Sequence, residues 1–303
     1  MQERKFRFVL SLITRENDYQ AEQASAAAEE ANRMGADLQV LFAENDAIKQ
    51  STQVLDVIQA RGVKTHAILV EPASRTGFPK AAQAAVKSGM AWVVLNSEAE
   101  YLSELRSGAN VPVFSVSADN QQIGRLQGHQ LGALLPRGGC VLYVQGPSSS
   151  SVVAPRLAGL LETKPEAISV RTLKSSDWTE DGGCHAVSAW LRLSTARNES
   201  IDAVQAQNDF LALGARRAFE QQIDTPQSRI RLPFLGVDGV PKTGQAWVRQ
   251  GSLTATIVVP PTAPRALEIL TNALRAGLQP AERTLVAPRS FPEAKELAPK
   301  DIS

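Results

Sequence analysis

The sequence has few cysteines and histidines and no large excess of either charge. Its 303 residues include two cysteines and three histidines, and the formal net charge is +1. Cys140 and Cys184 permit one disulfide but no disulfide framework, so we expect free thiols. The charges are mixed along the chain and form no basic stripe, which excludes nucleic acid as an expected partner.

Long apolar runs and enzyme motifs are also missing. No stretch reaches the roughly 20 apolar residues that a membrane-spanning helix needs. The sequence has no glycine-rich phosphate-binding motif, no serine nucleophile elbow, no H-E-x-x-H and no C-x-x-C. The histidines lie in three different expected elements, without metal-ligand spacing. We therefore expect no catalytic residue, no metal and no cofactor, although the same scaffold can carry enzymes.

The sequence does contain a regular alternation of short apolar runs and longer alanine-rich segments. Strands are expected at 6–13, 38–42, 67–70, 92–95, 111–116, 141–144, 168–173, 203–206, 233–237 and 253–259, with a weak strand at 284–287. Helices are expected at 21–34, 47–61, 79–87, 98–106, 123–135, 153–163, 181–194, 210–221, 242–250 and 263–276. This alternation predicts an α/β fold with parallel sheets covered by helices on both faces, in two similar lobes.

The first expected strand bears on where the protein works. Residues 6–13 form a short apolar run interrupted by Arg7 and Ser11, which favours a strand over an export signal. A periplasmic location is expected if a signal peptide has been removed ahead of this sequence. A cytoplasmic location is expected if Met1 is the native start.

Polar and aromatic residues follow many of the expected strands. Ligands of open parallel sheets bind beyond the carboxyl ends of the strands. The candidate ligand-binding residues at these ends are Asn17, Tyr19, Glu71 and Asn96 in the first half, and Arg156, Trp178, Asn208 and Asp238 in the second. Amide, carboxylate and guanidinium groups suit hydroxyl groups, and aromatic rings suit the C–H faces of a sugar. These residues therefore predict a small polar ligand, a sugar or a sugar-like molecule.

Each of these residues also has an ordinary structural explanation. Asn and Asp after strands are common turn formers and helix N-caps, and Asp209 is expected to cap the helix that follows it. Trp178 is equally expected as a packing residue. Only the joint placement of the set favours a ligand site.

Short stretches in a fixed order along the chain carry a family resemblance. They are 17–35 with Asn45-Asp46, Ala118-Asp119-Asn120 ahead of Gly124 and Gly128, 144–146, 154–159, 206–209 followed by 212–215, 235–239 and 255–257. Each stretch is weak alone, but the ordered set covers nearly the whole chain. The chain thereby resembles the type I periplasmic binding proteins, in the ribose-binding-protein-like branch, whose core is shared with the ligand domains of LacI-type repressors.

The resemblance implies two Rossmann-like lobes with a ligand cleft between them. Three crossings would join the lobes, near Ala118, Val237 and Val259. The N-terminal lobe would comprise residues 1–118 plus 260–286, and the C-terminal lobe residues 119–259 plus 287–303.

The resemblance also implies a function. The chain would be a monomeric solute-binding protein that closes over a sugar-like ligand and serves the membrane permease of an ABC-type importer. The alternative is a cytoplasmic ligand-sensing domain of a regulatory or signalling system. Among the strand-end residues, Arg156, Asn208 and Asp238 match the family pattern best.

Four positions depart from the pattern of ribose-binding relatives. Glu71 stands where Asn is usual, Gln20 replaces a second aromatic residue, Ser97 replaces an Arg, and Val259 replaces a Gln. A free carboxylate at Glu71 would favour an amine or several hydroxyl groups, and Val259 would leave an apolar wall. These differences favour a deoxy or amino sugar, a nucleoside-like compound or a small signalling molecule over ribose.

Overall fold

The chain is divided into two compact units. The computed structural model describes residues 5–62, 64–74, 78–97, 99–193, 200–221 and 232–298. The first unit comprises Met1–Ala118 and Pro261–Val286, and the second comprises Asp119–Pro260 and Ala287–Ser303. The chain therefore passes between the units after Ala118, Pro260 and Val286. Val237, predicted at a crossing, lies inside the second unit, where the neighbouring Asp238 pairs with Val258.

The first unit is built on a six-stranded parallel sheet with strand order β11-β5-β4-β3-β1-β2. Its strands are β1 (Arg7–Leu12), β2 (Asp37–Phe42), β3 (Ala67–Val70), β4 (Ala91–Leu95), β5 (Val113–Ala118) and β11 (Arg283–Val286). Its helices are α1 (Asp18–Arg33), α2 (Ala47–Gln59), α3 (Pro79–Lys87), α4 (Leu102–Ser107) and α12 (Thr262–Ala276). The parallel α/β prediction is confirmed here.

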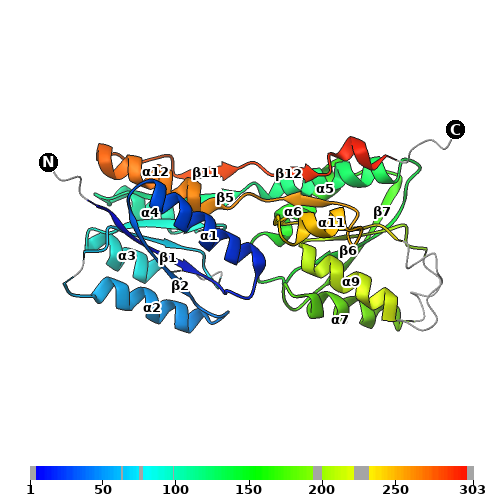
Figure 1. Cartoon of the computed structure of the whole chain (residues 1–303), viewed down its shortest axis with the longest axis horizontal. Helices are drawn as coiled ribbons and strands as arrows, with labels where there is room; N and C mark the ends of the chain where they lie inside the picture. The colour runs from blue at the N-terminus through cyan, green and yellow to red at the C-terminus, as the bar shows by residue number, and fades with distance from the viewer. Residues whose placement is uncertain are drawn as a thin grey trace. The chain divides into compact units, whose positions relative to one another are not determined.

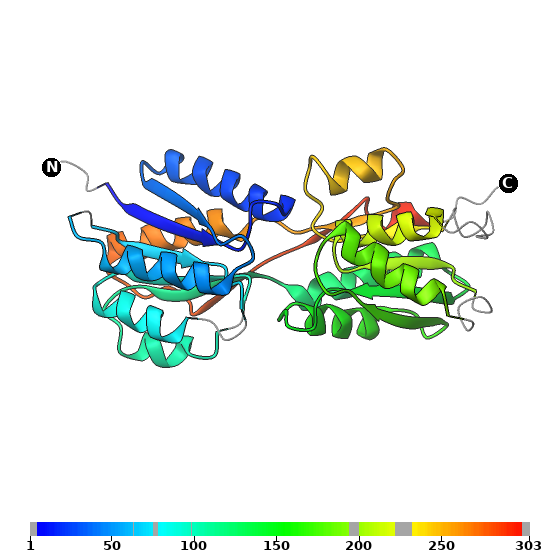
Figure 2. The same cartoon turned by 90° about the horizontal axis from the view of Figure 1, so that it is seen from below.

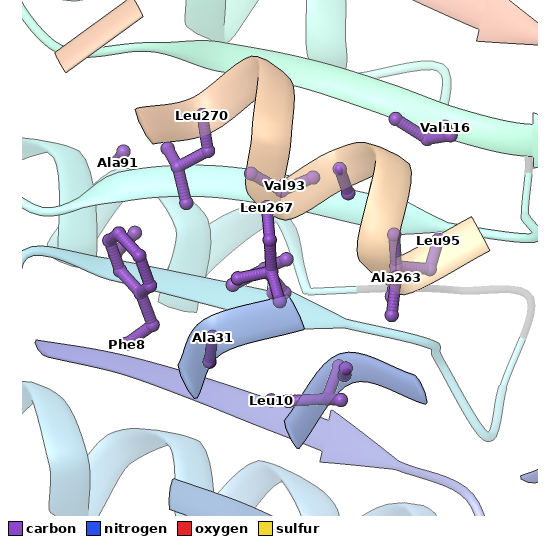
Figure 3. Close-up of a cluster of buried hydrophobic side chains, with 14 of the residues drawn as sticks. Phe8, Leu10, Ala31, Ala91, Val93, Leu95, Val116, Ala263, Leu267 and Leu270 are labelled. Carbon is purple, nitrogen blue, oxygen red and sulfur yellow. The ribbon is translucent and has the colours of Figure 1, made fainter. Parts of the chain in front are cut away.

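Alternate residues of the central strands of this sheet face two different helix layers. Along β4, Ala91, Val93 and Leu95 pack under α1 and α12, whereas Trp92 and Val94 pack against α2, α3 and α4. Figure 1 shows α1 and α12 on one side of the sheet and α2 and α3 on the other. Figure 3 shows the first layer, in which α12 contributes Ala263, Leu267 and Leu270. Burial on both faces explains why these strands are continuously apolar.

The second unit has a four-stranded parallel sheet with strand order β7-β6-β8-β9. Its strands are β6 (Gly139–Gln145), β7 (Ile168–Lys174), β8 (Ala203–Ala206) and β9 (Phe234–Leu235). Its helices are α5 (Asn120–Leu134), α6 (Val153–Thr163), α7 (Glu180–Leu191), α9 (Asp209–Gln221), α11 (Gly244–Arg249) and the 3-10 helix η1 (Ala294–Leu297). A separate ribbon pairs β10 (Thr256–Val258) with β12 (Arg289–Phe291) in the antiparallel sense.

The sheet of the second unit is also buried on both faces. Helices α7 and α9 lie side by side over one face, as Figures 1 and 2 show, and they cover Leu142, Val144 and Val204. Helices α5 and α6 cover the other face, over Val141 and Tyr143. Within the described residues, no helix is long and apolar enough to span a membrane.

Several element boundaries differ from the sequence-based prediction. Strand β5 begins at Val113 because Pro112 has no N–H to donate to a neighbouring strand. Strand β12 is not predicted by the sequence, because it is short, polar and bounded by Pro288 and Pro292. The predicted strand 233–237 shortens to Phe234–Leu235, and 253–259 shortens to Thr256–Val258. Positions 98 and 194, at the ends of two predicted helices, lie outside the described residues.

Glycines allow α5 and α6 to approach closely. A Cβ built on Gly159 of α6 would lie 2.0 Å from the backbone oxygen of Gln121 in α5. A Cβ on Gly124 of α5 would lie 2.0 Å from the backbone oxygen of Arg156 in α6. Neither position can hold a side chain unless a helix shifts. This close contact fixes the distance between α5 and the turn of α6 that carries Arg156.

We predict that Gly159→Ala destabilises the second unit. The added methyl meets backbone, which cannot rotate away, and overpacking of this kind costs about 1–3 kcal/mol. Urea unfolding followed by circular dichroism measures the change. Gly108→Ala is the matched control, because nothing lies within 4 Å of a Cβ at Gly108, and we expect a change within about 0.5 kcal/mol there. Equal losses in both variants would contradict the packing argument.

Candidate functional site

The carboxyl edge of the first sheet gathers polar side chains from several loops. Glu71 follows β3 directly and Asn96 follows β4 directly. In the sheet register, Ser11 of β1 lies beside Val70 of β3, and Val70 lies beside Val94 of β4. The three strands therefore end almost level, and the residues that follow them meet.

Helix α1 begins at this same edge. Asn17 caps the helix, because its Oδ1 accepts a hydrogen bond from the backbone N–H of Gln20 at 3.1 Å. Half-buried Tyr19 lies in the first turn, and its Oη accepts from Nδ2 of Asn96 at 3.4 Å. Asn17, Tyr19, Glu71 and Asn96 are thus placed together, with Tyr19, Asn96 and Glu71 linked by hydrogen bonds.

Glu71 is the centre of this cluster and is only 7% exposed. Its Oε2 accepts from Nδ2 of Asn96 at 3.2 Å and from Nε2 of Gln23 at 3.3 Å, and Gln20 also hydrogen-bonds to the carboxylate. Burial raises the pKa of Glu71 to about 7, and the three amides only partly offset this effect. The carboxylate is therefore enclosed by amides, whereas the sequence analysis expects a free carboxylate, and its pKa lies near neutral pH.

Gln20 and Gln23 are not identified as candidate residues from the sequence. Gln23 is fixed to α12, because its Nε2 donates to Oγ1 of Thr262 at 2.9 Å and its Oε1 accepts from the N–H of Ala263 at 2.9 Å. The available signal is spacing: Gln20 and Gln23 follow the cap Asn17 by three and six residues, so they share one helix face.

We predict that Glu71→Gln changes how stability depends on pH. The folded-state pKa of about 7 lies above the ordinary 4.5, so the folded protein binds this proton more tightly than the unfolded chain does. Stability then falls as the pH rises through this window, and the loss is complete above about pH 7. Between pH 5 and pH 8, the free energy of unfolding of the wild type should fall by about 2–3 kcal/mol relative to that of Glu71→Gln.

Urea unfolding at several pH values measures this difference. Glu44→Gln is the control, because Glu44 is an exposed carboxylate that pairs with Arg15 at 3.3 Å. Its pH profile should run parallel to that of the wild type. Parallel profiles for Glu71→Gln as well would show that Glu71 is not desolvated.

In the second unit, Arg156 is a buried cation held by fixed acceptors. It extends from α6 and is 7% exposed. Its Nε donates to Oδ1 of Asn120 at 2.9 Å, and its Nη1 donates to the backbone oxygen of Gln207 at 2.5 Å. The plane of the guanidinium group is therefore set by the start of α5 and by the loop that follows β8.

Gln207 connects the loops at this edge and is a residue that the sequence reasoning does not single out. Its Nε2 donates to Oη of Tyr143 at 3.0 Å and to the backbone oxygen of Val153 at 2.9 Å. Its Oε1 accepts from the N–H of Gly146 at 3.1 Å. Burial raises the pKa of Tyr143, so its hydroxyl stays protonated. The only available signal is that Gln207 follows a buried strand directly.

Asn208 and Trp178 are held against each other. The Nδ2 of Asn208 donates to the backbone oxygen of Trp178 at 2.9 Å, and its Oδ1 accepts from the N–H of Leu211 at 2.8 Å. The indole ring of Trp178 covers Gly146, where an added Cβ would lie 2.2 Å from the ring. Half-buried Trp178 therefore packs within the second unit, and Asn208 performs the capping at the start of α9.

Asp209 has a role different from the predicted one. The sequence predicts a helix cap, but Asp209 is already the first residue of α9, and Asn208 before it is the cap. The buried carboxylate of Asp209 instead accepts from the N–H of Gly239 at 2.8 Å and from Oγ1 of Thr256 at 2.6 Å. Asp209 thus ties the loop after β9 to strand β10.

Two residues of the site have backbone conformations that are unusual for residues other than glycine. The φ angle is 48° at Asn96 and 106° at Asp238. Asp238 is held by hydrogen bonds from its N–H to the oxygen of Ile257 and from the N–H of Val259 to its own oxygen, both at 3.0 Å. Such conformations cost free energy and concentrate at ligand sites. Glu44 and Asn45 after β2 also have positive φ angles, of 53° and 62°, so it is the φ of 106° at Asp238 that departs most from the conformations ordinary residues adopt.

The second unit brings most of its candidate residues together. Arg156, Trp178 and Asn208 surround the loop that follows β8, and Asp238 follows the neighbouring strand β9. Cys140 and Cys184 are free thiols, as predicted. In the parts of the chain that the structure describes, no three His, Cys, Asp or Glu side chains are grouped to hold a metal ion.

We predict that Asp209→Asn destabilises the second unit by about 1–3 kcal/mol. The amide places an N–H₂ group where the carboxylate oxygens accept from Gly239 and Thr256, so a buried donor loses its acceptor. Thermal or urea unfolding tests this. Asp119→Asn makes the same chemical change at the cap of α5, where Asn caps as well as Asp, and should be neutral. Wild-type stability in Asp209→Asn would show that the hydrogen bonds from Gly239 and Thr256 to Asp209 do not stabilise the second unit.

Comparisons with known proteins are consistent with this architecture. The profile of a periplasmic binding protein domain matches residues 8–277. The ribose import binding protein of Bacillus subtilis is 26% identical over 258 residues, which are 85% of this chain and 77% of that protein.

Two solved structures share the fold. An ABC transporter periplasmic solute binding protein from Actinobacillus succinogenes, with bound D-allose, has a TM-score of 0.82 and 23% identity, covering 97% of this chain and 99% of that chain. The Caulobacter myo-inositol binding protein, bound to myo-inositol, has a TM-score of 0.78 and 20% identity, covering 98% and 96%. At these identities the similarity shows the fold.

Proposed function

We propose that this chain, which belongs to the type I periplasmic binding protein family, binds a sugar or polyol and delivers it to an ABC-type importer. The observation that carries the proposal is the chemistry gathered at one edge of each sheet. The first unit contributes Asn17, Tyr19, Glu71 and Asn96, and the second contributes Arg156, Trp178, Asn208 and Asp238. The names of the relatives, which refer to ribose, D-allose and myo-inositol, support the same class of ligand.

The proposed contacts follow from the chemistry of a polyhydroxylated ring. Each hydroxyl both donates and accepts, so it suits an amide such as Asn96 and a carboxylate such as Asp238. Arg156 adds charge-assisted hydrogen bonds from a planar group that its neighbours already orient. Tyr19 and Trp178 offer aromatic surface to the C–H faces of the ring at a small cost in side-chain entropy.

The proposed mechanism is a shift between open and closed arrangements of the two units. A ligand that contacts both units binds the closed arrangement better, and its differential affinity sets how far the equilibrium shifts. The permease would then recognise the closed form. We propose that the protein is periplasmic and monomeric. Its proposed partner is a membrane permease, and we do not expect it to bind nucleic acid.

A thermal-shift screen tests the proposed function. Pentoses, hexoses, amino sugars, inositols, linear polyols and nucleosides are added to the purified chain. A ligand at 100 times its dissociation constant should stabilise the folded state by about 2.7 kcal/mol. Stabilisation by one sugar or polyol class supports the proposal, and no stabilisation by any of them contradicts it.

We predict that Arg156→Lys and Asp238→Asn each weaken binding of the screened ligand about 10- to 100-fold, because each removes a charge-assisted hydrogen bond. Lys keeps the charge of Arg156 but not its fork of donors. Asn tolerates the positive φ of Asp238 better than Ala would. Isothermal titration calorimetry measures the affinities, with melting temperatures as a folding check.

Arg137→Lys is the matched control for the second unit. Arg137 is exposed and lies before β6, at the opposite end of the strand from the candidate site. Its affinity for the ligand should equal that of the wild type. Wild-type affinity in both Arg156→Lys and Asp238→Asn would refute the site assignment.

A further inference from the structure

Glu71 is a buried carboxylate to which the described residues supply no positive charge. Its hydrogen-bond partners are the amides of Gln20 and Gln23 on α1 and of Asn96 after β4. In the described part of the chain, no lysine, arginine or histidine pairs with it. Buried carboxylates are normally paired with a cation or a metal, because the loss of water costs several kcal/mol.

The described side chains that hydrogen-bond in this cluster are neutral. Helix α1 presents Tyr19 in addition to the two glutamines, and Oη of Tyr19 bonds to Asn96. Helix α12 reaches the cluster through Oγ1 of Thr262, and Gln50 of α2 donates to the backbone oxygen of Glu71 at 2.9 Å. Tyr19 is the only other titratable residue among these. Among the described residues, the cluster therefore has one negative group, and the hydrogen-bond partners of the Glu71 carboxylate are neutral amides.

The contacts of the Glu71 carboxylate do not indicate a purely structural role. Asp209, the buried carboxylate of the second unit, bonds a backbone N–H and a threonine of separate loops and so holds them together. The amides around Glu71 are already fixed without it. Gln23 is bonded to Thr262 and Ala263, and Oδ1 of Asn96 accepts from the N–H of Ala118.

We infer that the ligand carries a protonated amine, and that Glu71 pairs with this amine at the carboxyl edge of the first sheet. The inference rests on the proposed function and narrows its ligand class to amino sugars and amino polyols. An ammonium group has three donors and no acceptor. It can meet Glu71 and one or two of the oxygen acceptors beside it, including Oη of Tyr19.

The pairing has a pH dependence of defined sign. The amine pairs with the ionised form of Glu71, and the pKa of Glu71 is about 7 before the amine neutralises its charge. Below pH 7, a proton competes with the amine for the carboxylate. Affinity for an amino sugar should therefore fall by up to about tenfold for each pH unit below 7. Affinity for the matching neutral sugar should not fall in this way.

The test compares matched ligand pairs by isothermal titration calorimetry at pH 7. The pairs are D-glucosamine with D-glucose, D-galactosamine with D-galactose, D-mannosamine with D-mannose, and 1-amino-1-deoxysorbitol with sorbitol. Each amino sugar is also tested as its N-acetyl derivative, which keeps the nitrogen but not the charge. At least one amine should bind about 10- to 100-fold more tightly than its neutral counterpart. The pH profile of that pair is then measured from pH 5 to pH 7 on the wild-type chain.

Two variants locate the preference. Glu71→Gln should reduce the amine-to-hydroxyl affinity ratio to about one, and its melting temperature reports whether it folds. Glu44→Gln removes a carboxylate after β2 of the same sheet, one that is exposed and already paired with Arg15, and should keep the wild-type ratio. The pH profile needs no variant, so it decides the question if Glu71→Gln fails to fold.

The outcomes separate the two levels of the proposal. A neutral sugar or polyol that binds at least as tightly as its amine overturns the inference and leaves the proposed function standing. An amine preference that survives in Glu71→Gln, or that does not weaken at low pH, overturns the role of Glu71. Binding of no sugar, polyol or amine overturns both the inference and the proposed function.

Discussion

The structure depends on burying each parallel sheet on both of its faces. Alternate residues of β4 face different helix layers, and the central strands β6 and β8 of the second unit are enclosed in the same way. A strand with two apolar surroundings carries few polar side chains along its length, and buried exceptions such as Ser11 of β1 and Gln205 of β8 are hydrogen-bonded. Most polar groups of the candidate site therefore lie where strands end and helices begin. The candidate site residues at these points follow from that constraint as directly as the core does.

The same constraint explains why structural and binding roles coincide in single residues. Asn17 and Asn208 each cap a helix at the carboxyl edge of a sheet. Capping uses the side-chain oxygen and leaves the amide hydrogens for other acceptors; in Asn208 they reach the backbone oxygen of Trp178. A residue that caps a helix is thereby held in one position, which is also what a ligand contact requires. A capping role is thus no argument against a ligand contact at the same residue.

The fold class and most element positions can be predicted from the sequence, because short apolar runs alternate with amphipathic, alanine-rich segments along the chain. Strand β12 cannot, since its pairing with β10 depends on a partner some thirty positions away and not on its own polar sequence. The candidate residues that directly follow strands are predictable for the same reason as the strands. The residues that hydrogen-bond to these candidates cannot be predicted in the same way. Gln23, Asn120 and Gln207 are identified only by the side chains that they contact in the folded unit. The prediction that Asp209 is a cap fails because a shift of one residue in a helix start exchanges its role with that of Asn208.

The three passages of the chain between the units have a consequence for biosynthesis. The first unit takes α12 and β11 from residues that follow almost the whole of the second unit. Leu267 and Leu270 of α12 complete a core layer of that first unit (Figure 3). Thr262 at the start of α12 fixes Gln23. During synthesis, the segment 1–118 must therefore wait with an open sheet face and an edge strand uncovered until residue 286 has left the ribosome. The second unit is completed later still, because β12 and η1 follow residue 286, so both units are finished only at the end of synthesis.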